Sequence, residues 1–177
     1  MSAAINQVCL ITVDGTDFKI NEPSPFNPDY YSHKINHAGL RYEVGVCIMT
    51  GWIVWINGPF PCGAWPDIRI ARDALHYELL AMEQYIVDGG YCKPSDPNPF
   101  ARTPDGTNTF EQMQYALGRS RHENINGWFK KWNCMRDEWR HERNKHSFAF
   151  RAVAIITQLR IQQGELIFNV DYDESDF

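Results

Sequence analysis

Carboxylates that could hold divalent cations follow two apolar runs in this sequence. Asp14 comes directly after the run Val8–Val13, and Asp88 comes directly after Tyr85–Val87. Short apolar runs bounded by Asp-Gly are typical of buried strands that end in a turn, so we predict two such strands. Active sites of open α/β sheets gather where strands end. We therefore expect these two carboxylates to converge.

A third acid, Glu123, lies in the basic segment Arg119–Asn126, which is expected to be helical. Converging carboxylates repel one another, and a hard cation with oxygen ligands would relieve that repulsion. Two Mg²⁺ or Mn²⁺ ions in such a site would activate a water and stabilise the leaving oxygen of a phosphoryl displacement. The sequence thus predicts Asp14, Asp88 and Glu123 as catalytic, metal-binding residues.

Each acid also has a simpler interpretation. Asp14 and Asp88 both precede a glycine, and Asp-Gly is an ordinary turn sequence. Glu123 could serve only as an ion-pair partner of Arg119, four positions earlier in the helix, or of Lys130. Asp17 is an alternative first ligand, although it is less closely tied to the end of the apolar run. The occurrence of all three acids together favours the metal site.

Charge is unevenly distributed along the chain. The whole sequence has 17 Lys and Arg residues against 22 Asp and Glu residues, a net charge of -5. Residues 119–151 hold nine of the basic and four of the acidic residues, so this segment is positive and the remainder strongly negative. Basic residues interleaved with tryptophans suit a phosphate backbone and unstacked bases, the alternative being a solvated helix face. The acidic total therefore does not exclude DNA as a partner.

Length and composition are those of a single globular domain, residues 1–177. With 44% apolar residues the chain can form a core, and no apolar run approaches the roughly 20 residues that span a bilayer. The first residues lack the basic segment of a signal peptide, and five cysteines without a Cys-x-x-Cys pair indicate reduced thiols. We expect an intracellular protein with no membrane association.

The elements that must position the acids are expected in the order β-β-β-α-β-α-α. Strands over 8–13, 41–50 and 52–57 are expected to form an antiparallel meander. Asp67 is expected to cap a helix reaching about residue 84, followed by a strand over 85–88 and a long loop over 93–109. Helices follow over 110–139 and 147–163, the second buried almost all round, with a last strand over 166–170. This order predicts an α/β protein with a mixed sheet (three antiparallel strands plus parallel strands) flanked by helices, as in the ribonuclease H-like fold.

The motifs resemble those of DDE-type transposases of the PIF/Harbinger kind. The matching stretches are Val13–Asp17, Trp65–Ile68, Val87–Tyr91 and Arg121–Lys130, and the 34 residues between Asp88 and Glu123 are typical of that superfamily. The resemblance implies a ribonuclease H-like endonuclease in which Asp14, Asp88 and Glu123 hold two Mg²⁺ or Mn²⁺ ions. Such an enzyme cuts a DNA phosphodiester and joins the freed 3′-hydroxyl to target DNA.

The resemblance also implies roles for residues around the acids. Arg121, Lys130 and Lys131 would contact DNA phosphates, and Arg119 is a further candidate that is also placed to pair with Glu123. Asp67 would be an accessory site residue if it is not simply a helix cap.

Members of this family usually carry a helix-turn-helix region ahead of the first aspartate, whereas only 13 residues precede Asp14 here. Either the chain is a fragment of a larger reading frame, or recognition of transposon ends is lost or comes from a separate DNA-binding partner protein. The second hypothesis is a non-catalytic, truncated or domesticated transposase remnant that binds DNA or protein. Either role is compatible with a homo-oligomer, and a DNA substrate implies the nucleus if the host is eukaryotic.

Overall fold

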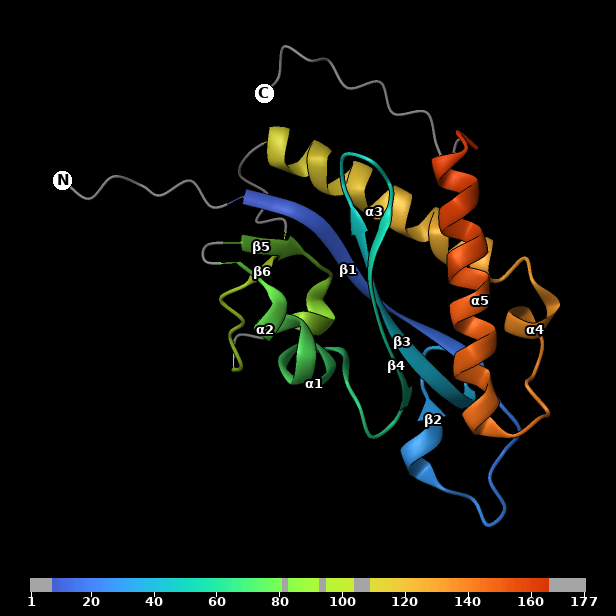
Figure 1. The fold of residues 1–177 in the computed structure, drawn as a ribbon. Helices are drawn as coiled ribbons and strands as arrows, with labels where there is room; N and C mark the ends of the chain where they lie inside the picture. Colours follow the sequence, from blue (N-terminus) through green and yellow to red (C-terminus); the bar gives the residue numbers. More distant parts are fainter. Residues whose placement is uncertain (1–7, 81–82, 93–94, 104–108, 166–177) are drawn as a thin grey trace.

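The computed structural model describes residues 8–80, 83–92, 95–103 and 109–165, which form a six-stranded sheet with helices (Figure 1). The strands are β1 (Val8–Lys19), β2 (Tyr31–Ser32), β3 (His37–Cys47), β4 (Ile53–Pro61), β5 (Glu83–Ile86) and β6 (Ala101–Arg102). The helices are α1 (Asp67–Ile70), the π-helical turn η2 (Ala71–Leu75), α2 (His76–Glu78), α3 (Thr109–Phe129), α4 (Asn133–Arg136) and α5 (Arg143–Gln162). Two 3-10 turns, η1 (Pro28–Tyr30) and η3 (Gly89–Tyr91), complete the described elements.

Strand β1 lies at the centre of the sheet, whose order is β2-β3-β1-β5-β6 with β4 also paired to β3. It runs antiparallel to β3 over Ile11–Lys19 and parallel to β5 over Val8–Thr12. The predicted meander, the hairpin around Gly51 and the parallel fourth strand are therefore confirmed. So is the predicted mixed α/β sheet flanked by helices.

The two faces of the sheet carry separate apolar clusters because side chains alternate along each strand. One cluster joins Phe18 of β1 to Ile125 of α3 and Phe150 of α5. The other joins Val13 of β1 to Leu75 at the end of η2. Helices α3 and α5 thus cover one face, and the helical segment α1–α2 packs against the opposite face (Figure 1).

The expected turn at Asp14-Gly15 is wrong, since β1 continues through both residues to Lys19. Gly15 is buried on the α1 side of the strand, where a Cβ atom would collide with Asp67 Oδ1 and lie 3.2 Å from Arg41 Cδ. A glycine inside a strand commonly marks such a close approach. Asp14 consequently sits within a paired strand and not at its end.

The helix that follows β4 differs from the expectation at both of its ends. Pro66 occupies the N-cap position, and Asp67 is the first helical residue and makes no capping hydrogen bond. Its carboxylate instead pairs with Arg41 Nη1 at 3.1 Å. Helix α2 ends at Glu78, because Leu79 turns into extended backbone ahead of β5, so the predicted continuation to residue 84 is wrong.

The C-terminal half also departs from the expectations. Helix α3 ends at Phe129, and Trp139 belongs to no helix, because its backbone bonds Lys19 and Asn21 beside the end of β1. Helix α5 is not buried all round: Phe148 and Ile155 are 72% and 60% exposed. The predicted loop over 93–109 contains the short strand β6, and the predicted strand over 166–170 lies outside the described residues.

Within the described residues, no helix has the length and apolar character needed to cross a membrane.

Candidate functional site

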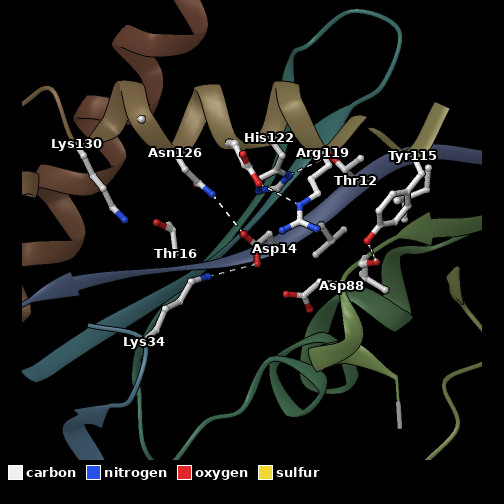
Figure 2. Close-up of a pocket in the computed structure, with 15 residues that line it drawn as sticks. Thr12, Asp14, Thr16, Lys34, Asp88, Tyr115, Arg119, His122, Asn126 and Lys130 are labelled. Atoms are coloured by element: carbon white, nitrogen blue, oxygen red, sulfur yellow. Dashed lines mark hydrogen bonds and ion pairs between the residues drawn. The ribbon is translucent and has the colours of Figure 1, made fainter. Parts of the chain in front are cut away.

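A cavity of about 440 Å³ lies between β1, the segment after β5 and one face of α3 (Figure 2). All three acids predicted from the sequence, Asp14, Asp88 and Glu123, line it. Three basic side chains line it as well, and the remaining lining is mostly small or uncharged. These basic residues are Lys34, Arg119 and Lys130. Elements far apart in the sequence therefore bring acids and bases into one cavity.

Asp14 projects from the middle of β1 toward α3. Its Oδ1 accepts a hydrogen bond from Gly15 N at 2.7 Å and lies 3.8 Å from Lys34 Nζ. Its Oδ2 lies 3.5 Å from Asn126 Nδ2 of α3. Burial raises the pKa of Asp14, the charge of Asp88 raises it further, and Lys34 opposes this. Asp14 is thus an acid whose negative charge is disfavoured by its surroundings.

Asp88 follows β5 and serves also as the cap of η3, since its Oδ1 accepts a hydrogen bond from Gly90 N at 2.8 Å. A Cβ atom on Gly90 would lie 3.0 Å from Asp88 Oδ1 and 3.3 Å from Asp67 Oδ2. Two carboxylates therefore flank Gly90. Asp88 forms the turn and also lines the cavity, so the two interpretations of this residue are compatible.

Asp67 lies beside this site, as expected of an accessory residue. Burial raises the pKa of Asp67 to about 6; Arg41 opposes this shift, and the charge of Asp14 adds to it. Its Oδ1 is buried and makes no hydrogen bond within the described residues, although Arg41 lies at ion-pair distance. Asp67 therefore adds a further partly desolvated negative charge behind Asp14 and Asp88.

Glu123 lies on the same face of α3 as Arg119, and the predicted ion pair between them is confirmed. Glu123 Oε1 accepts a hydrogen bond from Arg119 Nε at 3.1 Å, and both side chains are more than half exposed. Across the described parts of the chain, no three His, Cys, Asp or Glu residues are arranged to hold a metal ion in this conformation. The three acids share a cavity but are not assembled into a ligand cage.

The donor set nevertheless fits a hard divalent cation in its chemistry. Carboxylate oxygens are the ligands that Mg²⁺ and Mn²⁺ prefer. The raised pKa values of Asp14 and Asp67, caused by burial and by neighbouring acids, mark a place where positive charge is stabilising. Asp14, Asp88 and Glu123 are the residues that would hold such ions, with Glu123 releasing Arg119.

The basic residues predicted to contact phosphates are divided by the structure. Arg119 and Lys130 line the cavity. Lys131 lines a neighbouring depression on the outer side of α3 with Glu123, where its Nζ lies 5.3 Å from the Trp128 ring. Both depressions are open to solvent-borne ligands, so all three bases stay candidates for phosphate contacts.

Arg121 does not line the cavity. Its side chain is buried, and Nη1 donates to the backbone oxygens of Ile48 and Met49, in the turn between β3 and β4. Arg121 therefore anchors α3 to the β3–β4 hairpin, which corrects the expectation that it contacts phosphate at this site. The cause is helical geometry, since residue 121 is two positions from 119 and 123 and so points to another face.

Several cavity residues were missed by reasoning from the sequence. On α3, the lining positions 115, 119, 122, 123, 126 and 130 recur at helical spacing, and that periodicity could have indicated Asn126 and Tyr115. Tyr115 donates from its hydroxyl to Val87 O at 2.9 Å and so ties α3 to the backbone just before Asp88. Lys34 comes from the turn between β2 and β3, and no sequence signal points to it.

His122 is also part of the cavity wall. It is 3% exposed, its Nδ1 lies 3.0 Å from Thr12 Oγ1, and burial lowers its pKa to about 4, with the charge of Lys34 adding to this effect. The imidazole is therefore neutral near pH 7. We infer that His122 packs α3 against β1 and carries no charge toward a ligand.

Comparisons of the chain with protein-family models, with curated proteins and with solved structures find no match. The function is therefore inferred from the fold and from the residues of the cavity.

Proposed function

We propose that this chain is a divalent-metal-dependent DNA endonuclease and strand-transfer domain of the DDE transposase type, with a ribonuclease H-like fold. The fold assignment is supported by a central β1 that is antiparallel to β3 and parallel to β5, with helices on both faces. The compartment of such a protein is the nucleus if the host is eukaryotic.

The observation that carries the proposal is the convergence of Asp14, Asp88 and Glu123. They come from three different parts of the chain and line one cavity. An acidic group of this kind surrounded by lysine and arginine suits a phosphate ester with its cations.

When bound between the carboxylates, divalent cations would supply Lewis-acid stabilisation of charge on phosphoryl oxygens. The residues of the chain fix the carboxylates in place and supply positive charge on the cavity wall. Asp14 is fixed because its backbone is paired with Val44 of β3, and Asp88 is fixed by its bond to Gly90. Arg119 lies on the cavity wall, where a guanidinium can stabilise negative charge developing on oxygen. Burial keeps His122 neutral and makes it a weak base.

Nicking of supercoiled DNA by the purified chain with Mn²⁺ or Mg²⁺ tests this function. Asp88→Asn preserves the acceptor for Gly90 N and removes the charge, so it separates catalysis from turn formation. We expect a rate at least about 100-fold lower, since even groups that only orient metal ligands contribute 10–100-fold. Asp73→Asn, an exposed acid of η2, is the matched control and should nick at the unsubstituted rate. Equal nicking by Asp88→Asn would overturn the assignment.

The second candidate, a non-catalytic DNA-binding remnant, is favoured by one observation. Glu123 is occupied by Arg119, and the described residues hold no preassembled group of metal ligands. In that case the chain should bind DNA in a salt-sensitive manner and show no metal-dependent cleavage at any Mn²⁺ concentration.

A further inference from the structure

The two ends of the cavity differ in charge. In Figure 2, Asp14 lies in the middle of the cavity. Thr16, Lys34 and Lys130 lie on one side of Asp14, and Asp88 lies on the other side. We call the part lined by Thr16, Lys34 and Lys130 the basic end. The proposed metal chemistry uses the carboxylates and gives no role to Thr16 or Lys34.

Lys34 is held at the basic end by the backbone of β1. Its Nζ donates to Gly15 O at 2.8 Å and lies 3.8 Å from Asp14 Oδ1. An ammonium group has three N–H donors, and the bond to Gly15 uses one of them. The side chain is about half exposed, so its remaining donors face the cavity and solvent. Lys34 is thereby oriented with N–H donors left for a further partner.

Thr16 presents a polar group that lacks a partner. Its side chain is 1% exposed, and Oγ1 forms no hydrogen bond with any described residue, although Thr16 lines the cavity. Buried hydroxyls are almost always paired with protein or with a bound group. A hydroxyl left open toward a cavity therefore indicates a ligand that supplies the missing bond.

Lys130, the residue that follows α3, brings a second cation to the same end. Its Nζ lies 5.9 Å from the centre of the Phe18 ring. Lys34 and Lys130 line the same cavity. Burial lowers the pKa of Lys130, and the charge of Lys34 lowers it further. Two neighbouring cations and one unpaired hydroxyl form a place that an anion would satisfy.

We propose that Thr16, Lys34 and Lys130 form a phosphate-binding subsite that holds a phosphodiester of the nucleic acid adjacent to the one that reacts at the carboxylates. The assignment rests on the proposed nuclease function for its nucleic-acid ligand, but binding at this subsite requires no divalent cation. A phosphodiester carries a single negative charge, whereas a free phosphate or phosphomonoester carries nearly two at pH 7. Asp14, 3.8 Å from Lys34 Nζ, disfavours the more highly charged group, so the subsite selects the diester.

Metal-free binding tests the subsite. The full chain in EDTA is titrated into a fluorescent single-stranded oligonucleotide of about eight nucleotides without terminal phosphates, at several salt concentrations. We expect Lys34→Gln and Lys130→Gln each to weaken binding about 10-fold and to reduce the salt slope by about 0.7. Thr16→Val should weaken binding without changing the slope, and Thr16→Ser, which retains the hydroxyl, should restore it. Lys19→Gln, an exposed lysine of the same strand, is the matched control and should bind normally.

Competition and cleavage separate the remaining outcomes. Dimethyl phosphate should displace the oligonucleotide at lower concentration than inorganic phosphate, and the reverse order would overturn the assignment to a diester. Unchanged binding by both lysine variants, with thermal unfolding showing that they are folded, would overturn the subsite itself. If the variants weaken metal-free binding while the unsubstituted chain shows no metal-dependent nicking, the subsite stands and the nuclease assignment fails.

Discussion

The network around Asp17 makes a strong prediction about stability. Asp17 Oδ1 accepts from Arg41 Nε at 2.7 Å, and Oδ2 accepts from Arg41 Nη2 at 2.9 Å and from Ser32 Oγ at 2.5 Å. The Asp17 side chain is fully buried and that of Arg41 is 11% exposed. Asp17→Ala leaves Arg41 with Asp67 as its remaining carboxylate partner in the described structure. Removing one partner of a buried pair costs about 3–5 kcal/mol, because the other charge stays desolvated.

For a chain of this length, 1 kcal/mol corresponds to a shift in Tm of about 2–4 °C, so Asp17→Ala should lower Tm by about 6–20 °C. Circular dichroism during heating and urea unfolding measure this. Asp137→Ala, which breaks an exposed pair with Arg136, should leave Tm unchanged. The double variant Asp17→Leu/Arg41→Met removes both charges and should unfold at a higher temperature than Asp17→Ala. A fall of less than about 2 °C for Asp17→Ala would refute the reasoning.

The same pair predicts the behaviour in acid. Burial alone would raise the pKa of Asp17, but the hydrogen bond and charge of Arg41 outweigh burial, and the net pKa is lowered from its ordinary value of 3.8. A carboxyl group with a lowered pKa stabilises the fold above its unfolded pKa, and this contribution is lost as pH falls through the folded pKa. The difference in Tm between the unsubstituted chain and Asp17→Ala should therefore shrink below about pH 3.8.

Two further predictions concern the same face of the sheet. Burial raises the pKa of Glu43 from 4.5 to about 7, although Trp55 Nε1 donates a hydrogen bond to its Oε2 at 2.8 Å. Between pH 4.5 and 7 the Glu43 carboxyl group is therefore protonated in the folded state and ionised in the unfolded chain. Stability should fall by about 3 kcal/mol between pH 4.5 and 7, and Glu43→Gln should flatten this dependence; equal pH–Tm profiles for the two proteins would contradict it. Gly15→Ala should lower Tm because its Cβ collides with Asp67, whereas Gly89→Ala, with no atom within 4 Å, should not; equal Tm values would show that Asp67 moves aside freely.

Much of the fold could be predicted because hydrophobic pattern determines it locally. The strands β1, β3 and β4 are rich in β-branched and aromatic residues, and Gly51 has a positive φ of 71° in the turn that joins β3 to β4. The turn predicted at Asp14-Gly15 is wrong because Gly15 is required by the close approach of Asp67 and not by a local turn. Trp139 likewise follows a long-range backbone pairing with the end of β1, which local periodicity cannot reveal.

The candidate site could be predicted in part. Acids that follow apolar runs are visible in the sequence, and so is the spacing of four between Arg119 and Glu123. Arg121 was misassigned because charge alone does not show which face of a helix a residue occupies. Lys34 was missed because a turn residue acquires its role only when β1 and β3 pair and carry it to Gly15.

The position of Asp14 in a central strand has a consequence for the order of folding. The β1–β3–β4 meander connects neighbours along the chain, whereas pairing of β1 with β5 closes a much longer loop and is expected to form later. Asp14 meets Asp88 only when that long loop closes. The repulsion between the two carboxylates therefore opposes a late step, after the apolar meander has collapsed. Charge at the site should then slow the final closure of the sheet and leave the early nucleus unaffected.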